Sequence, residues 1–325
     1  MSSEPSFQPS ESVRTRDLPS HGVSPWRLRG PEWERVSHGL HAPAVFLRSV
    51  PELARLTAPV LPRDCGFGHL TSARLRNWWL PNQLGDHVLL ATTRSGVHVQ
   101  RAGLYVRRSR YAEVELVSGL ALMTAAQTLV ELARDLTLVD LVPMVDCALA
   151  AGASPDEILA AARPRAQGAR TLRRAVGLAD PLSESWWESV LRLLHVVAGL
   201  GPVECQVDVV GRNGLVGRAD LHLVGTNRYP ECDGGEHRTR ARHLSDLRRD
   251  KAMHRLGAER YGYTTFEIAR QPQVVIDDAE DARGYPHDPR RVARWWAVAR
   301  GSSLTAYGRN RLAARLERYR LAADR

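Results

Sequence analysis

Alternating hydrophobic and polar residues predict strands in both halves of the chain. HVLLATT at 87–93, GVHVQR at 96–101 and VECQVDVVG at 203–211 all alternate in this way. An Asn-Gly pair at 213–214 follows the third segment and favours a hairpin turn. LVGRADLHLV at 215–224 is therefore expected to return beside it, and further strands are expected around Glu231 and over 261–269.

Hydrophobic residues spaced three and four positions apart predict helices between and after these strands. The helical segments are 68–81, 119–134, 138–152, 184–199, 243–257, 288–300 and 308–320. Ser154 with Glu157, and Ser185 with Glu188, have the spacing of capping boxes at helix starts. The mixture of strands and helices predicts an α/β or α+β fold class.

Composition favours a large, reduced, basic protein. A length of 325 residues suggests about two domains, and 45 basic against 36 acidic residues give a net charge of +9. This charge favours a nucleic-acid partner, although a general bias toward arginine would also produce it. The four cysteines have no CxxC spacing, which indicates reduced thiols in the cytoplasm. No apolar run approaches 18 residues, so we expect neither a membrane span nor a signal peptide.

Acidic residues on two neighbouring predicted strands are the main candidates for chemistry. Asp220 lies on one strand, and Glu231 and Asp233 lie on the next. Carboxylates brought side by side form an all-oxygen pocket that suits Mg²⁺, with Mn²⁺ as an alternative. A basic stretch downstream is suited to holding DNA phosphates against that pocket. It contains Arg238, Arg240, Arg242, Arg248, Arg249 and Lys251.

The order of these residues resembles a nuclease family. The following residues occur in this order: ESWWE at 184–188, Gln206, Arg218 with Asp220, Glu231-x-Asp233-Gly234, His237-Arg238 and a closing Leu256-Gly257. This series resembles that of the very-short-patch-repair endonucleases, in the PD-(D/E)xK superfamily. The resemblance implies a restriction-endonuclease-like mixed sheet flanked by helices over 180–278. It also implies that the protein hydrolyses DNA phosphodiesters, with Asp220 and Glu231 as metal ligands and with Glu188 and Asp233 assisting.

Two departures from the family pattern leave an alternative open. Asp233 stands where the superfamily has lysine, and arginine cannot be deprotonated to act as a base. His237 is then the candidate proton acceptor or phosphate contact. Pro230 precedes Glu231, and proline removes a ladder hydrogen bond, so we expect this strand to be distorted or shortened. The alternative is a non-catalytic DNA-binding regulator on a nuclease fold.

The N-terminal half resembles a different family. GHLTSARLRNWWLP at 68–81 and GLALMTAAQTLVELAR at 119–134 are similar to motifs of AbiEi-type antitoxins. This resemblance implies a possible toxin-antitoxin partner protein and a structural role for His69. The segments expected along the chain are a disordered tail (1–12), a remnant winged-helix-like segment (13–45), an AbiEi-like module (46–152), a helical connector (153–179), the nuclease-like domain (180–278) and basic helices (279–325).

Overall fold

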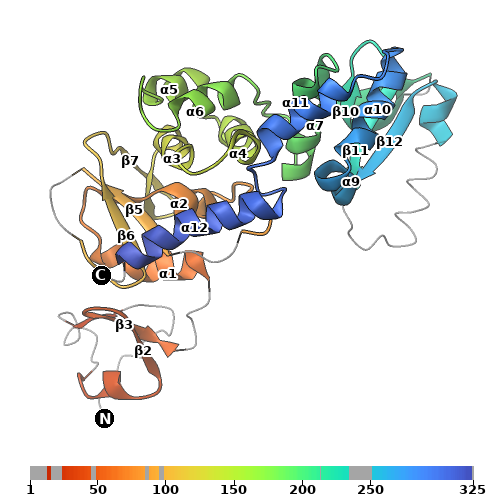
Figure 1. Cartoon of the computed structure of the whole chain (residues 1–325). Helices are drawn as coiled ribbons and strands as arrows, with labels where there is room; N and C mark the ends of the chain where they lie inside the picture. The colour runs from red at the N-terminus through yellow and green to blue at the C-terminus, as the bar shows by residue number, and fades with distance from the viewer. Residues whose placement is uncertain are drawn as a thin grey trace. The chain divides into compact units, whose positions relative to one another are not determined.

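The computed structural model describes residues 13–15, 24–44, 49–84, 88–94, 99–212, 214–233 and 251–323. The chain is a mixed α/β protein, which confirms the expected fold class at that level. It divides into two compact units (Figure 1). The first unit contains residues 1–80, 84–135 and 312–325, and the second contains 81–83 and 136–311. Among the described helices, none is long and apolar enough to cross a membrane.

The first unit is built on a five-stranded mixed sheet. Its strand order is β6 (Leu104–Arg108), β5 (Leu89–Thr93), β4 (Cys65–Phe67), β8 (Leu120–Met123) and β7 (Val114–Val117). Phe67 of β4 lies opposite Leu122 of β8, and both side chains are fully buried in the core. The helical elements of this part are α1 (Val50–Thr57), η4 (Ala58–Val60), α2 (His69–Leu75) and α3 (Ala125–Leu132).

A second, smaller sheet in the first unit is formed near the N-terminus. Its strands are β1 (Val13–Arg14), β3 (Leu40–Pro43) and β2 (Trp33–Ser37), in that order across the sheet, and η2 (Arg27–Arg29) precedes β2. β3 pairs antiparallel with both neighbours. Leu40 and Ala42 of the central strand are fully buried, so even this small sheet has an apolar side.

Two buried carboxylates accept several hydrogen bonds inside the first unit. Asp135 Oδ2 lies 3.0 Å from His69 Nε2 and accepts from the Tyr319 hydroxyl at 2.6 Å. Glu131 accepts from the His69 backbone N–H at 2.9 Å and from the Thr92 hydroxyl at 2.6 Å. We call these residues the Asp135 network. Burial opposes ionisation of Asp135, but its bonds to His69 and Tyr319 bring its pKa down to about 2. This agrees with a structural role for His69.

The second unit combines a helical layer with two strand pairs. Its helices are α4 (Leu138–Ala150), α5 (Pro155–Ala161), α6 (Ala169–Val176), α7 (Trp186–Ala198), α9 (Thr265–Arg270), α10 (Pro272–Arg283) and α11 (Pro289–Ala299). α12 (Ala306–Ala323) begins in this unit, and its residues from Leu312 onward belong to the first. The strands β9 (Val203–Gly211) and β10 (Gly214–Leu223) pair antiparallel, whereas β11 (Arg228–Asp233) and β12 (Glu259–Thr264) pair parallel.

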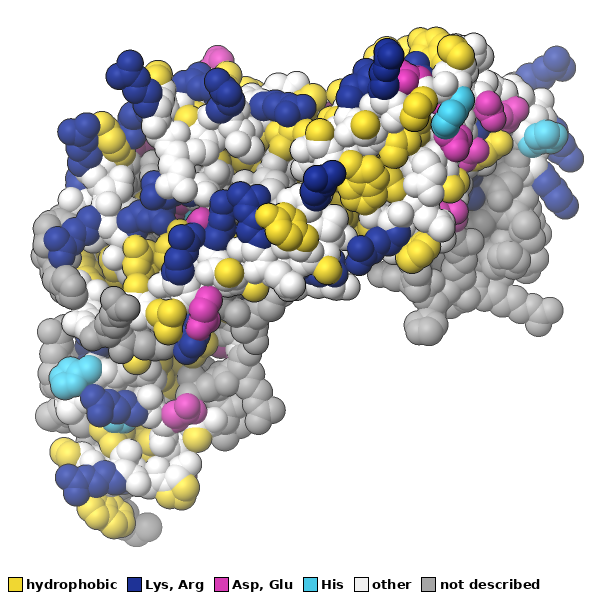
Figure 2. Space-filling model, in the orientation of Figure 1, with side chains coloured by type: hydrophobic (Ala, Val, Ile, Leu, Met, Phe, Trp, Pro, Cys, Tyr) yellow, Lys and Arg dark blue, Asp and Glu magenta, His cyan; other side chains and the backbone are white. Residues whose placement is uncertain are grey.

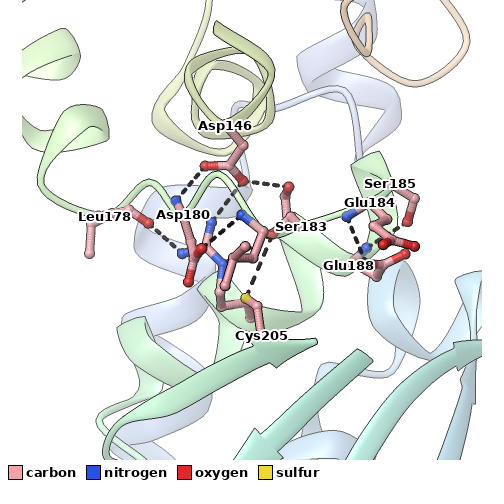
Figure 3. Close-up of polar contacts among 11 residues, drawn as sticks. Asp146, Leu178, Asp180, Ser183, Glu184, Ser185, Glu188 and Cys205 are labelled. Carbon is pink, nitrogen blue, oxygen red and sulfur yellow. Dashed lines mark hydrogen bonds and ion pairs between the residues drawn. The ribbon is translucent and has the colours of Figure 1, made fainter. Parts of the chain in front are cut away.

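A buried ion pair fixes α7 against α4. Asp146 of α4 is fully buried and accepts from Arg192 Nη2 of α7 at 2.8 Å (Figure 3). The Ser189 hydroxyl and the Asp180 backbone N–H also donate to this carboxylate, at 2.6 and 2.8 Å. Because both carboxylate oxygens accept hydrogen bonds and one of the donors is a guanidinium, these contacts offset part of the cost of burying the charge. The contacts hold α7 in a fixed orientation, with its N-terminal end at the strands.

Most of the long predicted elements are confirmed. β5, β9 and β10 form where alternation predicted strands, and α4, α7, α11 and α12 form where helical spacing predicted helices. The predicted helix at 68–81 is shorter, because α2 ends at Leu75. Of the predicted helix at 243–257, residues 251–255 are helical and 243–250 lie outside the described residues.

Three predictions of secondary structure are wrong, each for a local reason. The segment 119–134 is not one helix: Ser118 and Gly119 both have positive φ, so a hairpin turn leads into β8 before Thr124 caps α3. The strand expected over 261–269 ends at Thr264, where a capping box with Glu267 starts α9. The strand expected over 96–101 is not found in its described residues, 99–101, and the strand of this region begins at Leu104.

Two finer predictions are also corrected. Ser154 stands at the N-cap of α5, but its side chain makes no capping bond, so the predicted box with Glu157 does not form. The strand at Pro230 is not shortened: β11 runs through six residues, and Pro230 lies opposite Tyr261 of β12. Proline is tolerated because β11 forms a ladder with β12, while no ladder joins it to β10 in the described residues.

Candidate functional site

Glu188 is positioned by the first turn of α7. Ser185 caps this helix, accepting from the Glu188 backbone N–H at 3.1 Å. The Glu188 carboxylate bonds to the Glu184 backbone N–H at 2.9 Å, one residue before the position that a capping box would use (Figure 3). Its side chain is 8% exposed. The predicted capping role is therefore met in part, and the carboxylate is held at the end of α7 that lies near the strands.

Asp220 lies beside Glu188. Gln206, on β9, donates to Glu188 Oε2 at 3.0 Å, and the pairing of its neighbours with β10 places it across from Asp220. Burial raises the pKa of Glu188; the bond from Glu184 lowers it, and the charge of Asp220 raises it again. The effect of Asp220 on the pKa of Glu188 means that the two negatively charged side chains lie close enough to repel each other.

The strand β11 adds Asp233 to this group. The backbone N–H of Cys232 donates to Asp220 Oδ2 at 3.3 Å, which links β10 to β11. Burial, followed by the charges of Asp220, Glu188 and Asp233, raises the pKa of the Cys232 thiol to about 12. The thiol thus remains protonated at neutral pH and is a poor metal ligand. We call Glu188, Asp220 and Asp233, gathered around Cys232, the acidic site.

The position of Asp233 depends on a glycine in the adjacent strand. Gly262 of β12 has no side chain, and a Cβ at this position would overlap the Asp233 carboxylate. Asp233 therefore lies directly over the β12 backbone. Asp233 Oδ1 is also 3.9 Å from Arg260 Nη2. Any larger residue at position 262 would displace the carboxylate from the acidic site.

Glu231 is bound to an arginine that the sequence analysis did not single out. Arg260 Nε donates to Glu231 Oε2 at 2.5 Å, and Glu231 is only 4% exposed. Arg260 and Glu231 lie on the same face of the β11–β12 pair, since alternate residues of a strand share a face and Glu231 lies opposite Gly262. The strand was predicted to start at Tyr261, so Arg260 was not included in it. The alternation of Arg260, Gly262 and Thr264 with Tyr261 and Tyr263 was the signal that could have extended the strand to Arg260.

The structure therefore brings together only part of the predicted set. Glu188 and Asp220 are neighbours, and Asp233 is next to Cys232 in the chain, whereas Glu231 is ion-paired with Arg260. Arg218 is half-exposed and pairs with Glu184 at 2.5 Å, and Lys251 is exposed. The remaining predicted residues lie outside the described residues: His237, Arg238, Arg240, Arg242, Arg248 and Arg249.

Comparison of the chain with protein-family models, with curated proteins and with solved structures found no match. The arguments for a function therefore rest on the residues themselves.

The acidic site fits a hard divalent cation by the type of its donors. All three side chains offer carboxylate oxygens, which Mg²⁺ and Mn²⁺ prefer. The acidic site is not a compact set of three ligands. In the described residues, the group whose ligand atoms all lie within 4.8 Å of one another is Asp277, Glu280 and His287. Mg²⁺ commonly uses one or two carboxylates and keeps several waters, so a closed set of three is not required. Asp220 and Glu188 are the residues that would hold it.

The basic residues of the chain do not form one concentrated patch on the face drawn in Figure 2. Figure 2 shows Lys and Arg side chains spread over the face that it draws. The chain carries a net charge of +9, which attracts polyanions over a distance set by ionic strength. The charge supports general affinity for nucleic acid, whereas the acidic site would repel phosphates unless a cation neutralised it.

Proposed function

We propose that residues 180–278 bind DNA and hydrolyse its phosphodiester bonds with the help of Mg²⁺ or Mn²⁺. The observation that carries the proposal is the closeness of Glu188 on α7 and Asp220 on β10. Gln206, across from Asp220, donates to Glu188 Oε2 at 3.0 Å, and the Cys232 backbone N–H on β11, next to Asp233, donates to Asp220 Oδ2 at 3.3 Å. Keeping like charges together costs free energy, which a bound divalent cation would return.

Each residue of the acidic site has a proposed role. Asp220 and Glu188 hold the cation, which when bound lowers the pKa of a water and neutralises the leaving oxygen. Gln206 donates to Glu188 Oε2 and so orients this carboxylate. Asp233 lies at the edge of the site, where it could accept the proton of an attacking water. His237 and Arg238 are the proposed phosphate contacts.

A second candidate function is a DNA-binding protein without catalysis. The Arg260–Glu231 ion pair favours it, because a guanidinium occupies the carboxylate that the nuclease resemblance assigns to the metal. Arginine stays protonated at any physiological pH, so this pair is not released by titration. On this alternative, the acidic site is a remnant and the basic surface alone binds DNA.

The deciding experiment is cleavage of supercoiled plasmid and of a single-stranded oligonucleotide, in Mg²⁺ and in Mn²⁺. Asp220→Asn and Glu188→Gln are expected to reduce cleavage by about 100-fold or more while DNA binding persists, since both remove a cation ligand. Asp208→Asn is the matched control, because Asp208 is an exposed carboxylate on the adjacent strand β9 and should leave cleavage unchanged. DNA binding without cleavage by the wild-type protein would support the second candidate.

A further inference from the structure

A pocket in the first unit is lined with hydrogen-bond donors. Its volume is about 320 Å³, it is open to solvent, and it lies far along the chain from the acidic site. The residues that line it are Arg35, Val36, Ser37, His38, Gln100, Arg101, Ala102 and Ala323. These described lining residues include two guanidinium groups and contain no Asp or Glu. We call this cavity the basic pocket.

Arg101 is fixed in place at the basic pocket. Its Nη1 donates to Ser37 Oγ at 3.1 Å and to the His38 carbonyl oxygen at 2.7 Å. A guanidinium has five N–H donors, so these two bonds immobilise the side chain and leave others for a ligand. Burial lowers the pKa of Arg101, and the charge of Arg14 lowers it further, which indicates that cations are crowded here. The guanidinium nevertheless stays charged, as arginine does in proteins.

Arg35 and His38 add further donors. Arg35 Nη2 lies 3.0 Å from His38 Nδ1. Since a guanidinium only donates, Nδ1 must accept, and the ring proton of a neutral His38 is then on Nε2. Both side chains are exposed, so a ligand reaches them without rearrangement of the core. Ala323, at the C-terminal end of α12, also lines the pocket, and the dipole of this helix contributes about half a negative charge, less than the two guanidinium charges.

We propose that the basic pocket binds a phosphate group, with Arg35, Arg101 and His38 as its hydrogen-bond donors. Guanidinium groups match the geometry of phosphate oxygens, and two of them on a pocket free of carboxylates among its described residues select an anion over a cation. The phosphate can come from a nucleic-acid backbone or from a free phosphate compound. This proposal does not rest on the cleavage proposed for the second unit.

Inorganic phosphate is the probe for the test, titrated into the full-length protein and followed by calorimetry and by thermal unfolding. Arg35→Gln is the main variant because Arg35 is exposed and its loss leaves Ser37 and Arg101 paired. It should bind phosphate about tenfold more weakly, as expected for loss of a charge-assisted hydrogen bond. Arg29→Gln removes an exposed charge from the same N-terminal region outside the pocket and should bind phosphate like the wild type.

A second titration with a DNA duplex distinguishes the two sources of phosphate. If Arg35→Gln also weakens duplex binding and lowers its salt dependence by about one charge, the ligand is a nucleic-acid phosphate. If phosphate binding falls and duplex binding does not, the ligand is a free phosphate compound. Equal phosphate affinity of the wild type and Arg35→Gln, or no phosphate binding by the wild type, would overturn the proposal. Plasmid cleavage by Arg35→Gln reports separately on the second unit.

Discussion

The two units bury carboxylates in opposite ways. In the Asp135 network, His69 and Tyr319 bond to Asp135, and its pKa falls to about 2. In the acidic site, burial raises the pKa of Glu188, and the charge of Asp220 beside it raises this pKa further. In the first arrangement the neighbours of the carboxylate favour its charge, whereas in the second the charge of Asp220 opposes ionisation of Glu188. Burial opposes ionisation in both places, and the hydrogen bonds and charges around each carboxylate decide the direction of its pKa shift.

The largest expected effect is on the stability of the first unit. Glu131→Ala removes the acceptor of the His69 N–H and the Thr92 hydroxyl, leaving two buried donors unsatisfied. We expect the free energy of unfolding to fall by about 3 kcal/mol, measured from urea unfolding. Glu113→Ala, at an exposed carboxylate, should change it by less than about 0.5 kcal/mol. A loss below about 1 kcal/mol for Glu131→Ala would show that the network contributes little.

Removing Arg260, the ion-pair partner of Glu231, should leave the Glu231 carboxylate without this positive charge, next to the acidic site. Arg260→Gln takes the guanidinium from a carboxylate that is 4% exposed, and we expect a loss of about 2 kcal/mol in unfolding free energy. Added Mg²⁺ should restore more stability to this variant than to the wild type, because the cation can replace the lost charge. Arg218→Gln, whose pair with Glu184 is half-exposed, is the control and should lose less than about 1 kcal/mol. Equal Mg²⁺ effects on all three proteins would argue against a cation site here.

Acid should weaken the first unit through Asp135. Its folded-state pKa of about 2 lies below the value of about 3.9 for an unfolded Asp, so its stabilisation is present above pH ~4 and is lost as the pH falls toward 2. Urea midpoints measured between pH 7 and pH 3 should fall less steeply for Asp135→Asn than for the wild type. Parallel curves for the two proteins would mean that Asp135 does not titrate in this range.

The smallest expected effect has the opposite sign. Without divalent cations, Glu188→Gln should raise the unfolding free energy at pH 7 by up to about 1 kcal/mol, since it removes repulsion from Asp220. The folded-state pKa of Glu188 lies above its unfolded value, so its ionisation destabilises the fold as the pH rises. The gain should therefore shrink as the pH falls through this raised pKa. A loss of stability at pH 7 would show that the carboxylate is compensated.

The sequence predicted the strands of the acidic site but not all of its contacts. Alternation located β9 and β10, and the spacing of Asp220, Glu231 and Asp233 placed carboxylates on adjacent strands. The Arg260–Glu231 pair could not be predicted, because it depends on the register of two parallel strands joined by a long connection. The same is true of the Tyr319–Asp135 bond, which joins residues 184 positions apart. Local periodicity carries no information on such pairings.

Local sequence patterns also led to errors at two helix starts, those of α9 and α5. Thr264 and Glu267 form a capping box within a segment whose tyrosines favour a strand, and the box decides where the strand ends. Ser154 and Glu157 have the same spacing, yet no capping bond forms. A capping pattern therefore marks a candidate helix start, and side-chain geometry decides whether the capping bond forms.

Binding of Mn²⁺ to the cation-free, full-length protein tests the central claim most directly, because it needs no DNA and no cleavage. Titration followed by electron paramagnetic resonance would compare the wild type with Asp220→Asn and with the control Asp208→Asn. We expect the wild type and Asp208→Asn to bind Mn²⁺ with equal affinity and Asp220→Asn to bind at least about tenfold more weakly. Equal binding by all three proteins, or none by the wild type, would contradict the assignment of the acidic site as a cation site.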